Sequence, residues 1–186
     1  MTTALDRPDT TEPSNLLVRR GRVWKLGDDV SSDELINARH VFEYDPRILR
    51  KHLLHDLLPE FAEQAQPGDL VVAGRRFAHG SQHSHPFLAM KDMGLGLLTV
   101  RPTRAPFRLA IYMGVPLLDI DAETYALITD GETLHVDFAQ GLVEQPASQR
   151  TFRVAPQPDF LQDILRAGGG LGYMREQAAT PSRNTV

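Results

Sequence analysis

The segment from residue 74 to residue 86 holds the densest set of side chains that can bind an anion. It reads GRRFAHGSQHSHP. The side chains able to hydrogen-bond an anion there are those of Ser81, Gln82, His83, Ser84 and His85. Gly80 comes just before them, and a glycine lets the backbone approach a ligand closely. The segment therefore predicts an anion-binding loop.

Two regular elements are expected to position this loop. The short apolar run at residues 70–73 predicts a buried strand before it, and Pro86 predicts the first turn of a helix that ends at Gly94. In open α/β sheets ligands bind beyond the carboxyl ends of strands, and a helix N-terminus offers free N–H groups with a partial positive charge. A simpler interpretation also stands, in which Ser84 only caps the helix.

A metal site is the competing interpretation of the same loop. His79, His83 and His85 have a spacing at which imidazole nitrogens can hold a metal ion. The loop contains no carboxylate to complete the set, and loop spacing fixes no geometry. We therefore expect no metal ligands in this chain and keep the three histidines as the minor alternative.

Strands and helices alternate through the first two thirds of the chain. The pattern at residues 16–26 predicts a strand, and Asp45-Pro46 predicts the start of a helix over residues 45–61, with Pro59 as its stop. Further on, residues 97–100 and 115–120 read as strands around a helix in residues 101–114. Strand, helix and strand at these spacings imply parallel βαβ units.

The pattern changes after Tyr125. Alternating residues around Asp130-Gly131 and around Gln140-Gly141 predict hairpins, and residues 158–166 predict a last amphipathic helix. The chain should thus form an α/β fold, a mixed sheet with flanking helices.

Length and composition restrict the class of protein. A chain of 186 residues with 41% hydrophobic and 24% charged residues suits one globular domain, which we place at residues 16–176. Polar residues 1–15 predict a disordered tail, and residues 177–186 a second one. No run is long and apolar enough for a membrane span or a signal peptide, so we expect a cytoplasmic protein.

Charge and cysteine content exclude two further classes. The net charge of −4 does not favour nucleic acid as a partner. Residues 74–108 contain six basic residues and a single acid, Asp92, which suits a small anionic ligand. With no cysteine, this chain cannot hold an iron–sulfur cluster through thiolates.

Five segments in this order and spacing resemble the small subunit of 3-isopropylmalate dehydratase, the swivel domain of the aconitase family. The resemblance runs from about Gly21 to Arg175. The segments are GRVWKLGDDVSSDELINARH, PEFAEQAQPGDLVVAGRRFAHGSQHSHPFLAMKDMGLG, FRLAIYMGVPLL, HVDFAQGLVEQ and PDFLQDILRAGGGLGYMRE. The resemblance implies an aconitase swivel-like β/β/α domain.

The resemblance also implies a reaction and a partner. The chain would be active only with a large subunit, which carries a [4Fe–4S] cluster on its own cysteines. The pair would be a hydro-lyase that dehydrates and rehydrates a malate-like substituted hydroxy dicarboxylate, as in leucine biosynthesis. A heterodimer, or a dimer of heterodimers, is the assembly the family suggests.

The chain departs from the family at the loop. Where the family has Gly-Ser-Ser-Arg-Glu-His, this sequence has Gly-Ser-Gln-His-Ser-His at residues 80–85. The resemblance makes Ser81 the base that removes a proton next to a carboxylate, and it makes Gln82, His83 and Ser84 substrate-binding residues. His83 replaces a permanent, bidentate cation with a group that titrates near neutrality.

Other family positions are partly retained. The family's Asp-Thr-Asp segment appears as Ser31, Ser32 and Asp33. Arg104 and Arg108 are retained and are expected either to bind substrate or to hold the structure. Phe42 occupies the stretch where such subunits select the substrate side group, and it predicts an apolar one.

Two hypotheses of function follow. The first is the catalytic small subunit, with Ser81 as base. The second is a catalytically inactive swivel-domain subunit that serves assembly or regulation, motivated by the replaced arginine and glutamate of the loop. We favour the enzyme, because the serine is retained while its neighbours differ.

Overall fold

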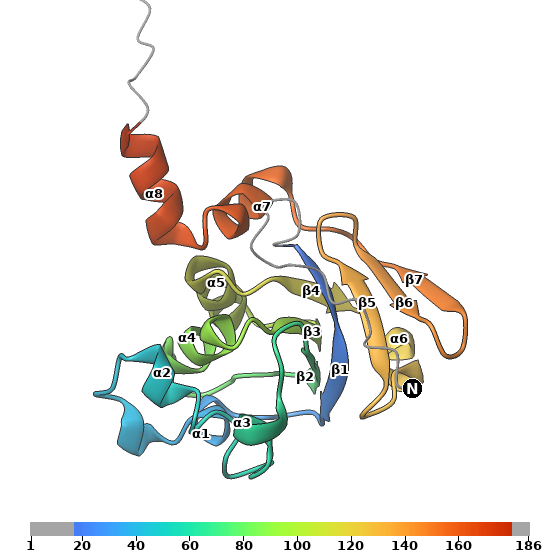
Figure 1. The fold of residues 1–186 in the computed structure, drawn as a ribbon, viewed down its shortest axis with the longest axis horizontal. Helices are drawn as coiled ribbons and strands as arrows, with labels where there is room; N and C mark the ends of the chain where they lie inside the picture. Colours follow the sequence, from blue (N-terminus) through green and yellow to red (C-terminus); the bar gives the residue numbers. More distant parts are fainter. Residues whose placement is uncertain (1–16, 180–186) are drawn as a thin grey trace, which may run out of the picture.

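The computed structural model describes residues 17–179. The expected N-terminal tail, and residues 180–186 of the expected C-terminal tail, lie outside the described residues. Residues 177–179 belong to a helix, so the regular structure continues past the boundary expected at residue 176. Figure 1 shows one layered body from which this last helix extends.

A seven-stranded mixed sheet forms the centre of the molecule, in the order β4-β3-β2-β1-β5-β6-β7. Its strands are β1 (Val18–Leu26), β2 (Leu70–Arg75), β3 (Gly96–Val100), β4 (Leu117–Ile120), β5 (Thr133–Asp137), β6 (Leu142–Gln145) and β7 (Arg150–Arg153). Strands β1 to β4 pair in parallel, whereas β5, β6 and β7 add antiparallel to the other side of β1. The predicted βαβ units and mixed sheet are confirmed.

Helices connect and cover these strands. They are α1 (Ser32–Leu35), the 3₁₀ helix η2 (Ala38–His40), α2 (Pro46–Leu49), α3 (Phe61–Gln64), α4 (His85–Asp92), α5 (Arg104–Met113), α6 (Ala122–Leu127), α7 (Asp159–Arg166) and α8 (Gly170–Ala179). Helices α4 and α5 are the parallel crossovers, and they lie beside each other on one face of the sheet (Figure 1). None of the helices within residues 17–179 is long and apolar enough to cross a membrane.

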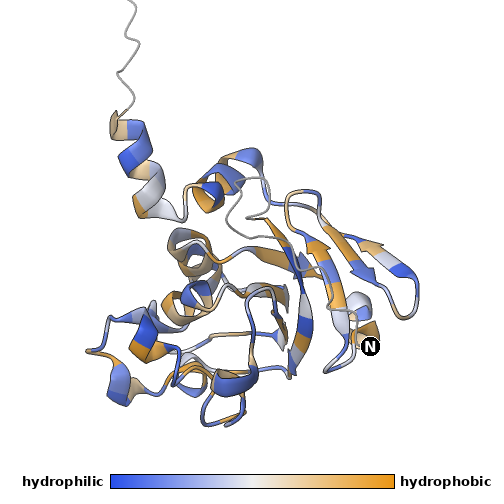
Figure 2. Ribbon diagram, viewed as in Figure 1, coloured by the Kyte–Doolittle hydropathy of each residue, from blue (hydrophilic) through white to orange (hydrophobic). Residues whose placement is uncertain are grey.

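Two apolar cores lie on the two faces of the sheet. Neighbouring residues of β1 point to opposite faces, so Trp24 packs in the core with α4 while Val23 packs in the core with β5 and α7. Strands β2 and β3 read as nearly continuous apolar runs because both of their faces are covered. Figure 2 shows hydrophobic stretches, in orange, along strands of the sheet. Each fully buried large side chain contributes about 1.5–3 kcal/mol of transfer free energy.

The single helix predicted over residues 45–61 is wrong. The start is right, because Asp45 accepts a hydrogen bond from Arg47 N and Pro46 occupies the first turn. The helix nevertheless ends at Leu49. Leu54 adopts a left-handed conformation, with a φ of 59°, and its N–H donates to the carbonyl of Leu35 instead of continuing the helix. Tertiary packing of buried Leu53 and Leu54 overrides the helical periodicity.

One of the two predicted hairpins is also wrong. Residues before Asp130-Gly131 form helix α6, capped by Asp121, so no strand precedes this turn. The hairpin at Gln140-Gly141 is confirmed as the β5–β6 pair. Strand β7 and helix α8 were not expected from the sequence.

Candidate functional site

The loop at residues 76–84 lies at the carboxyl end of β2 and leads into α4, as the sequence predicts. Hydrogen bonds join its backbone, and the end of β2 before it, to the first residue of α1 and to the segment before α1. The N–H of Ser32 donates to the carbonyl of His79 at 2.8 Å, and Asp29 N donates to the carbonyl of Arg75, also at 2.8 Å. The segment that contains Asp29 and Ser32 therefore forms one structural unit with the loop.

Helix α1 is held by its own capping box. The side chain of Ser31 accepts from Glu34 N, and Glu34 in return accepts from the backbone N–H of Ser31 at 2.7 Å. Hydrogen bonds from the backbone and then from the side chain of Ser31 lower the pKa of Glu34. This cap fixes where α1 starts and so fixes the position of Asp33 beside the loop.

The exposed side of the loop carries Ser81 and Gln82. Gly80 has a φ of 93°, a conformation that glycine adopts without strain, and it turns the chain toward α4. The side-chain amide of Gln82 donates to the carbonyl of Gly80 at 2.8 Å, which steadies the turn.

The start of α4 has no side-chain cap. Ser84 occupies the cap position with φ −83° and ψ −8°, and its hydroxyl makes no capping hydrogen bond. Ser84 is therefore not the simple cap that the alternative interpretation required. The first N–H groups of α4 keep their partial positive charge beside the exposed loop, an arrangement suited to a carboxylate.

The inner side of the loop carries the two histidines. The side chain of His83 is 10% exposed, and His85 is 2% exposed as a residue. Their Nδ1 atoms lie 3.1 Å apart, and Nε2 of His83 lies 3.6 Å from Oδ1 of Asp33. The ring of Tyr44 packs on His85 at 4.9 Å between centroids. The ring nitrogens of both histidines thus face the protein.

The charge of His85 is disfavoured by its surroundings. Burial lowers the pKa of His85, and the neighbouring His83 lowers it further, although the backbone carbonyls of Val41 and Glu43 act in the opposite direction. His85 is therefore less protonated than an exposed histidine at the same pH.

Three buried polar atoms at this site have no hydrogen-bond partner among the described residues. They are Nε2 of His83, Nε2 of His85 and Oγ of Ser32. A β-carbon built on Gly80 would lie 3.8 Å from Ser32 Oγ, so this hydroxyl sits directly under the loop. Sequence reasoning did not select Ser32 or Asp33 as site residues, although the match to the family's Asp-Thr-Asp segment pointed to them.

The geometry does not assemble the alternative metal site. Nε2 of His79 lies 2.9 Å from the carbonyl oxygen of Asp29, away from the pair formed by His83 and His85. Between residues 17 and 179, no group of three His, Cys, Asp or Glu side chains is placed to hold a metal ion.

Three residues that the sequence analysis expects to bind substrate lie outside the contacts that join the loop, α1 and the start of α4. Arg104 is the first residue of α5, which follows the carboxyl end of β3, so it shares the sheet edge of the loop. Arg108 lies one turn further on and lines an apolar cavity of about 380 Å³ between α5 and α7. Phe42 is 93% exposed in the segment before α2. In the described chain no hydrogen bond or ion pair joins either arginine to the loop.

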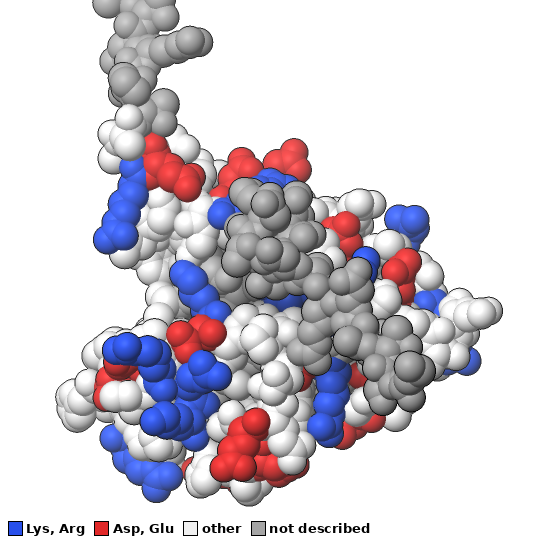
Figure 3. Space-filling view, viewed as in Figure 1, with Lys and Arg blue, Asp and Glu red and all other residues white. Residues whose placement is uncertain are grey.

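Basic side chains gather over the lobe formed by α2 and its neighbours on the face drawn in Figure 3. The exposed basic residues of this lobe are Arg39, Arg47, Arg50 and Lys51. This surface, together with the exposed Phe42 and Tyr44, borders the unit that contains the loop.

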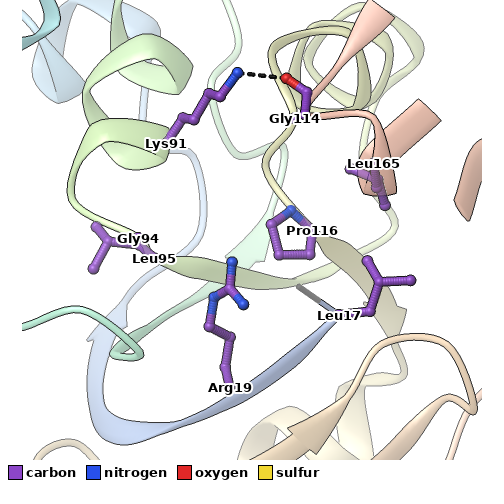
Figure 4. A pocket seen from close by; sticks show the side chains of 9 residues that line it. Leu17, Arg19, Lys91, Gly94, Leu95, Gly114, Pro116 and Leu165 are labelled. Atoms are coloured by element: carbon purple, nitrogen blue, oxygen red, sulfur yellow. Dashed lines mark hydrogen bonds between the residues drawn. The ribbon is translucent and has the colours of Figure 1, made fainter. Parts of the chain in front are cut away.

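A separate cavity of about 190 Å³ opens at the opposite edge of the sheet (Figure 4). Helices α4 and α5 end beside it, and the Nζ of Lys91 donates to the carbonyl of Gly168 after α7. Burial lowers the pKa of Arg19, which also lines it, to about 10. Cations suit the negative ends of helices, so these two residues have a structural explanation.

Comparisons with known proteins agree with the fold and with the resemblance. No family model matches the chain. The 3-isopropylmalate dehydratase small subunit of Aquifex aeolicus is 37% identical over 163 residues, which cover 87% of this chain and 96% of that protein. Small subunit 1 of the same enzyme from Archaeoglobus fulgidus is 36% identical over 162 residues, covering 85% and 99%.

A solved structure extends the agreement to three dimensions. The crystal structure of 3-isopropylmalate dehydratase from Methanocaldococcus jannaschii superposes with a TM-score of 0.82 and 25% identity, over 90% of this chain and 99% of that one. The predicted α/β swivel architecture is thereby confirmed. On identity, coverage and fold together, the chain belongs to the 3-isopropylmalate dehydratase small-subunit family.

Proposed function

We propose that this chain is the catalytic small subunit of a two-subunit hydro-lyase that acts on a malate-like substituted hydroxy dicarboxylate. The observation that carries the proposal is the exposed Ser81 in the loop that leads into the uncapped N-terminus of α4, in a chain of this family. The partner is a large subunit, and the pair works in the cytoplasm on a substrate related to 3-isopropylmalate.

Ser81 is the residue that takes the proton next to a substrate carboxylate. A serine hydroxyl becomes basic only where its alkoxide is stabilised, and the partial positive charge of the α4 N-terminus supplies that stabilisation. The same N–H groups, with Gln82 and Ser84, bind the carboxylate and so place the reacting carbon against Ser81. Arg104 and Arg108 complete our set of substrate-orienting residues, and His83, whose ring nitrogens face the protein, contributes by holding the loop.

The [4Fe–4S] cluster of the proposed enzyme belongs to the large subunit. This chain has no cysteine, and the described residues offer no triad of metal ligands. The residues of this chain therefore do not fit the cluster, and the chemistry at the leaving hydroxyl is the partner's. This chain supplies the base and the carboxylate site.

The substrate should have an apolar side group. Phe42 is almost fully exposed on the lobe that borders the loop. It can contact such a group when the two subunits assemble.

Replacing Ser81 tests the proposal. The tagged chain is purified without oxygen from its own cells, and turnover of substituted malates is measured on the complex. We expect Ser81→Ala to reduce kcat by a factor on the order of 10² to 10⁴ without loss of the co-purified large subunit. The matched control is Ser148→Ala, because Ser148 lies in the β6–β7 turn. Unchanged turnover in Ser81→Ala would refute the role of Ser81.

The inactive-subunit alternative is favoured by one observation. The side chain at the family's arginine position, His83, is turned toward His85 and Asp33 rather than toward the exposed side. That hypothesis expects a stable complex that turns over no hydroxy acid, whether or not Ser81 is present.

A further inference from the structure

The contacts of His83 define a linked set of three ionisable groups under the loop. His83 lies between His85 of α4, at 3.1 Å, and Asp33 of α1, at 3.6 Å. The two imidazole rings are inclined by 62° with centroids 5.0 Å apart. These contacts join three segments of the chain at a point two residues beyond Ser81.

The contact between the two Nδ1 atoms accommodates a single proton. A hydrogen bond of this length between two ring nitrogens needs one N–H donor and one lone-pair acceptor. The carboxylate of Asp33 only accepts, so it favours a proton on Nε2 of His83. When the pair carries one positive charge, the contact between the rings and the attraction of Asp33 are both satisfied if His83 holds two protons and His85 presents its Nδ1 lone pair. Nε2 of His83 then lies at ion-pair distance, rather than hydrogen-bond distance, from Oδ1 of Asp33.

The surroundings of His85 disfavour a charge on His85 and so also favour placing the positive charge on His83. His85 is the more deeply buried of the two, and its pKa is lowered by that burial and by His83. Tyr44 covers it with a neutral ring, and only the carbonyls of Val41 and Glu43 favour its charged form. Two positive charges at 3.1 Å would repel strongly, so the pair accepts one charge.

The location of the charge matters for Ser81. His83 is separated from Ser81 by Gln82 alone, and its only ion-pair partner among residues 17–179 is Asp33. The capping box fixes the start of α1, and the hydrogen bond from Ser32 N to the carbonyl of His79 joins α1 to the loop, so Asp33 has a defined position beside it. A charged His83 draws the end of the loop toward this fixed carboxylate.

We propose that Asp33 and His85 are positioning residues that hold His83 as a doubly protonated imidazolium, and that this ion sets the position of Ser81. The inference rests on the proposed function only in its last step. The protonation state can be tested on the free full-length chain without any activity.

The first test is NMR of the histidine ring nitrogens in the ¹⁵N-labelled full chain at about pH 5.5. Among the ring signals of the seven histidines, we expect one ring with two protonated nitrogens whose signal disappears in His83→Gln, and one ring with a single protonated nitrogen whose signal disappears in His85→Gln. Asp33→Asn should remove the doubly protonated signal at this pH, whereas Asp33→Glu should retain it. Asp33 is exposed and lies outside the Ser31–Glu34 pair, so the variant should fold.

Glu63→Gln is the matched control, because it removes one exposed negative charge from α3 and leaves α1 unchanged. Two independently protonated rings would overturn the inference. So would a spectrum of Asp33→Asn identical to that of the unmodified chain.

The second test uses the complex with the large subunit. We expect Asp33→Asn to lower kcat about tenfold with KM changed less than about twofold, and Asp33→Glu to restore most of kcat. A full kcat in Asp33→Asn, with Ser81→Ala inactive, would overturn the positioning role and leave the proposed function standing. Activity in Ser81→Ala would instead refute the proposed function, while the NMR result is unaffected.

Discussion

Asp69 shows how one buried residue aligns two parallel strands. It is 2% exposed and precedes β2. Its Oδ1 accepts from Arg22 N at 2.9 Å, and its Oδ2 accepts from the indole N–H of Trp24 at 3.1 Å and from Gln66 N at 2.9 Å. Both carboxylate oxygens are therefore needed as acceptors.

Asp69→Asn should reduce the free energy of unfolding by about 2–3 kcal/mol, because an amide offers one acceptor oxygen and turns its NH₂ against another donor. The measurement is urea unfolding of the full chain. Asp163→Asn, which removes an exposed pair with Arg166, should change it by less than about 0.5 kcal/mol. Equal effects in the two variants would contradict the argument.

At the scale of the element, the N-terminus of α4 is less stable than a capped helix and is open to a ligand. Its N-terminus lacks a side-chain cap, which leaves the helix less stable than its sequence permits and leaves its N–H groups free for a ligand. A permanent negative charge at this position would satisfy the helix and compete with a substrate carboxylate.

Ser84→Asp should therefore raise the free energy of unfolding by about 0.3–1 kcal/mol and raise KM by about tenfold or more. Unfolding and steady-state kinetics on the complex measure the two effects. Ser148→Asp, far from any helix start, should change neither by a comparable amount. A lower KM in Ser84→Asp would show that the anion does not bind at this helix.

The loop and its neighbouring elements illustrate what the sequence could predict and what it could not. The loop, the strand before it and the start of α4 follow from Gly80, Pro86 and a short apolar run, which are local signals. The contact of His83 with Asp33 is not local, because it depends on how residues 28–35 pair with the end of β2. The helix expected over residues 45–61 was wrong for the same kind of reason. It ends at Leu49, and the N–H of Leu54 donates to Leu35, which is distant in the sequence, instead of continuing a helix.

At the scale of the whole molecule, three histidines are held in surroundings that disfavour their charge. Burial is the main cause that lowers the pKa of His52, His85 and His135. Below about pH 6.5 the unfolded chain takes up more protons at these residues than the folded chain does, so the stability of the fold rises with pH through this window.

We therefore expect the urea midpoint of the full chain to fall between about pH 7.5 and pH 5.5. His135→Gln should lessen this fall, because it removes one of the three groups without touching the loop. A variant at the exposed His55 serves as the matched control. A midpoint that does not fall over this range would contradict the expectation.

The double pairing of β1 has a consequence for how the protein forms during its synthesis. The second half of β1 pairs with β2, but its first half, Val18–Arg22, pairs with β5, which begins only at Thr133. The parallel half of the sheet can therefore assemble as soon as residue 120 has emerged from the ribosome, with one edge of β1 still open. Such an edge is a template for pairing with another nascent chain. The β5–β6 hairpin, which is synthesised later, pairs with this edge and so protects the protein against aggregation.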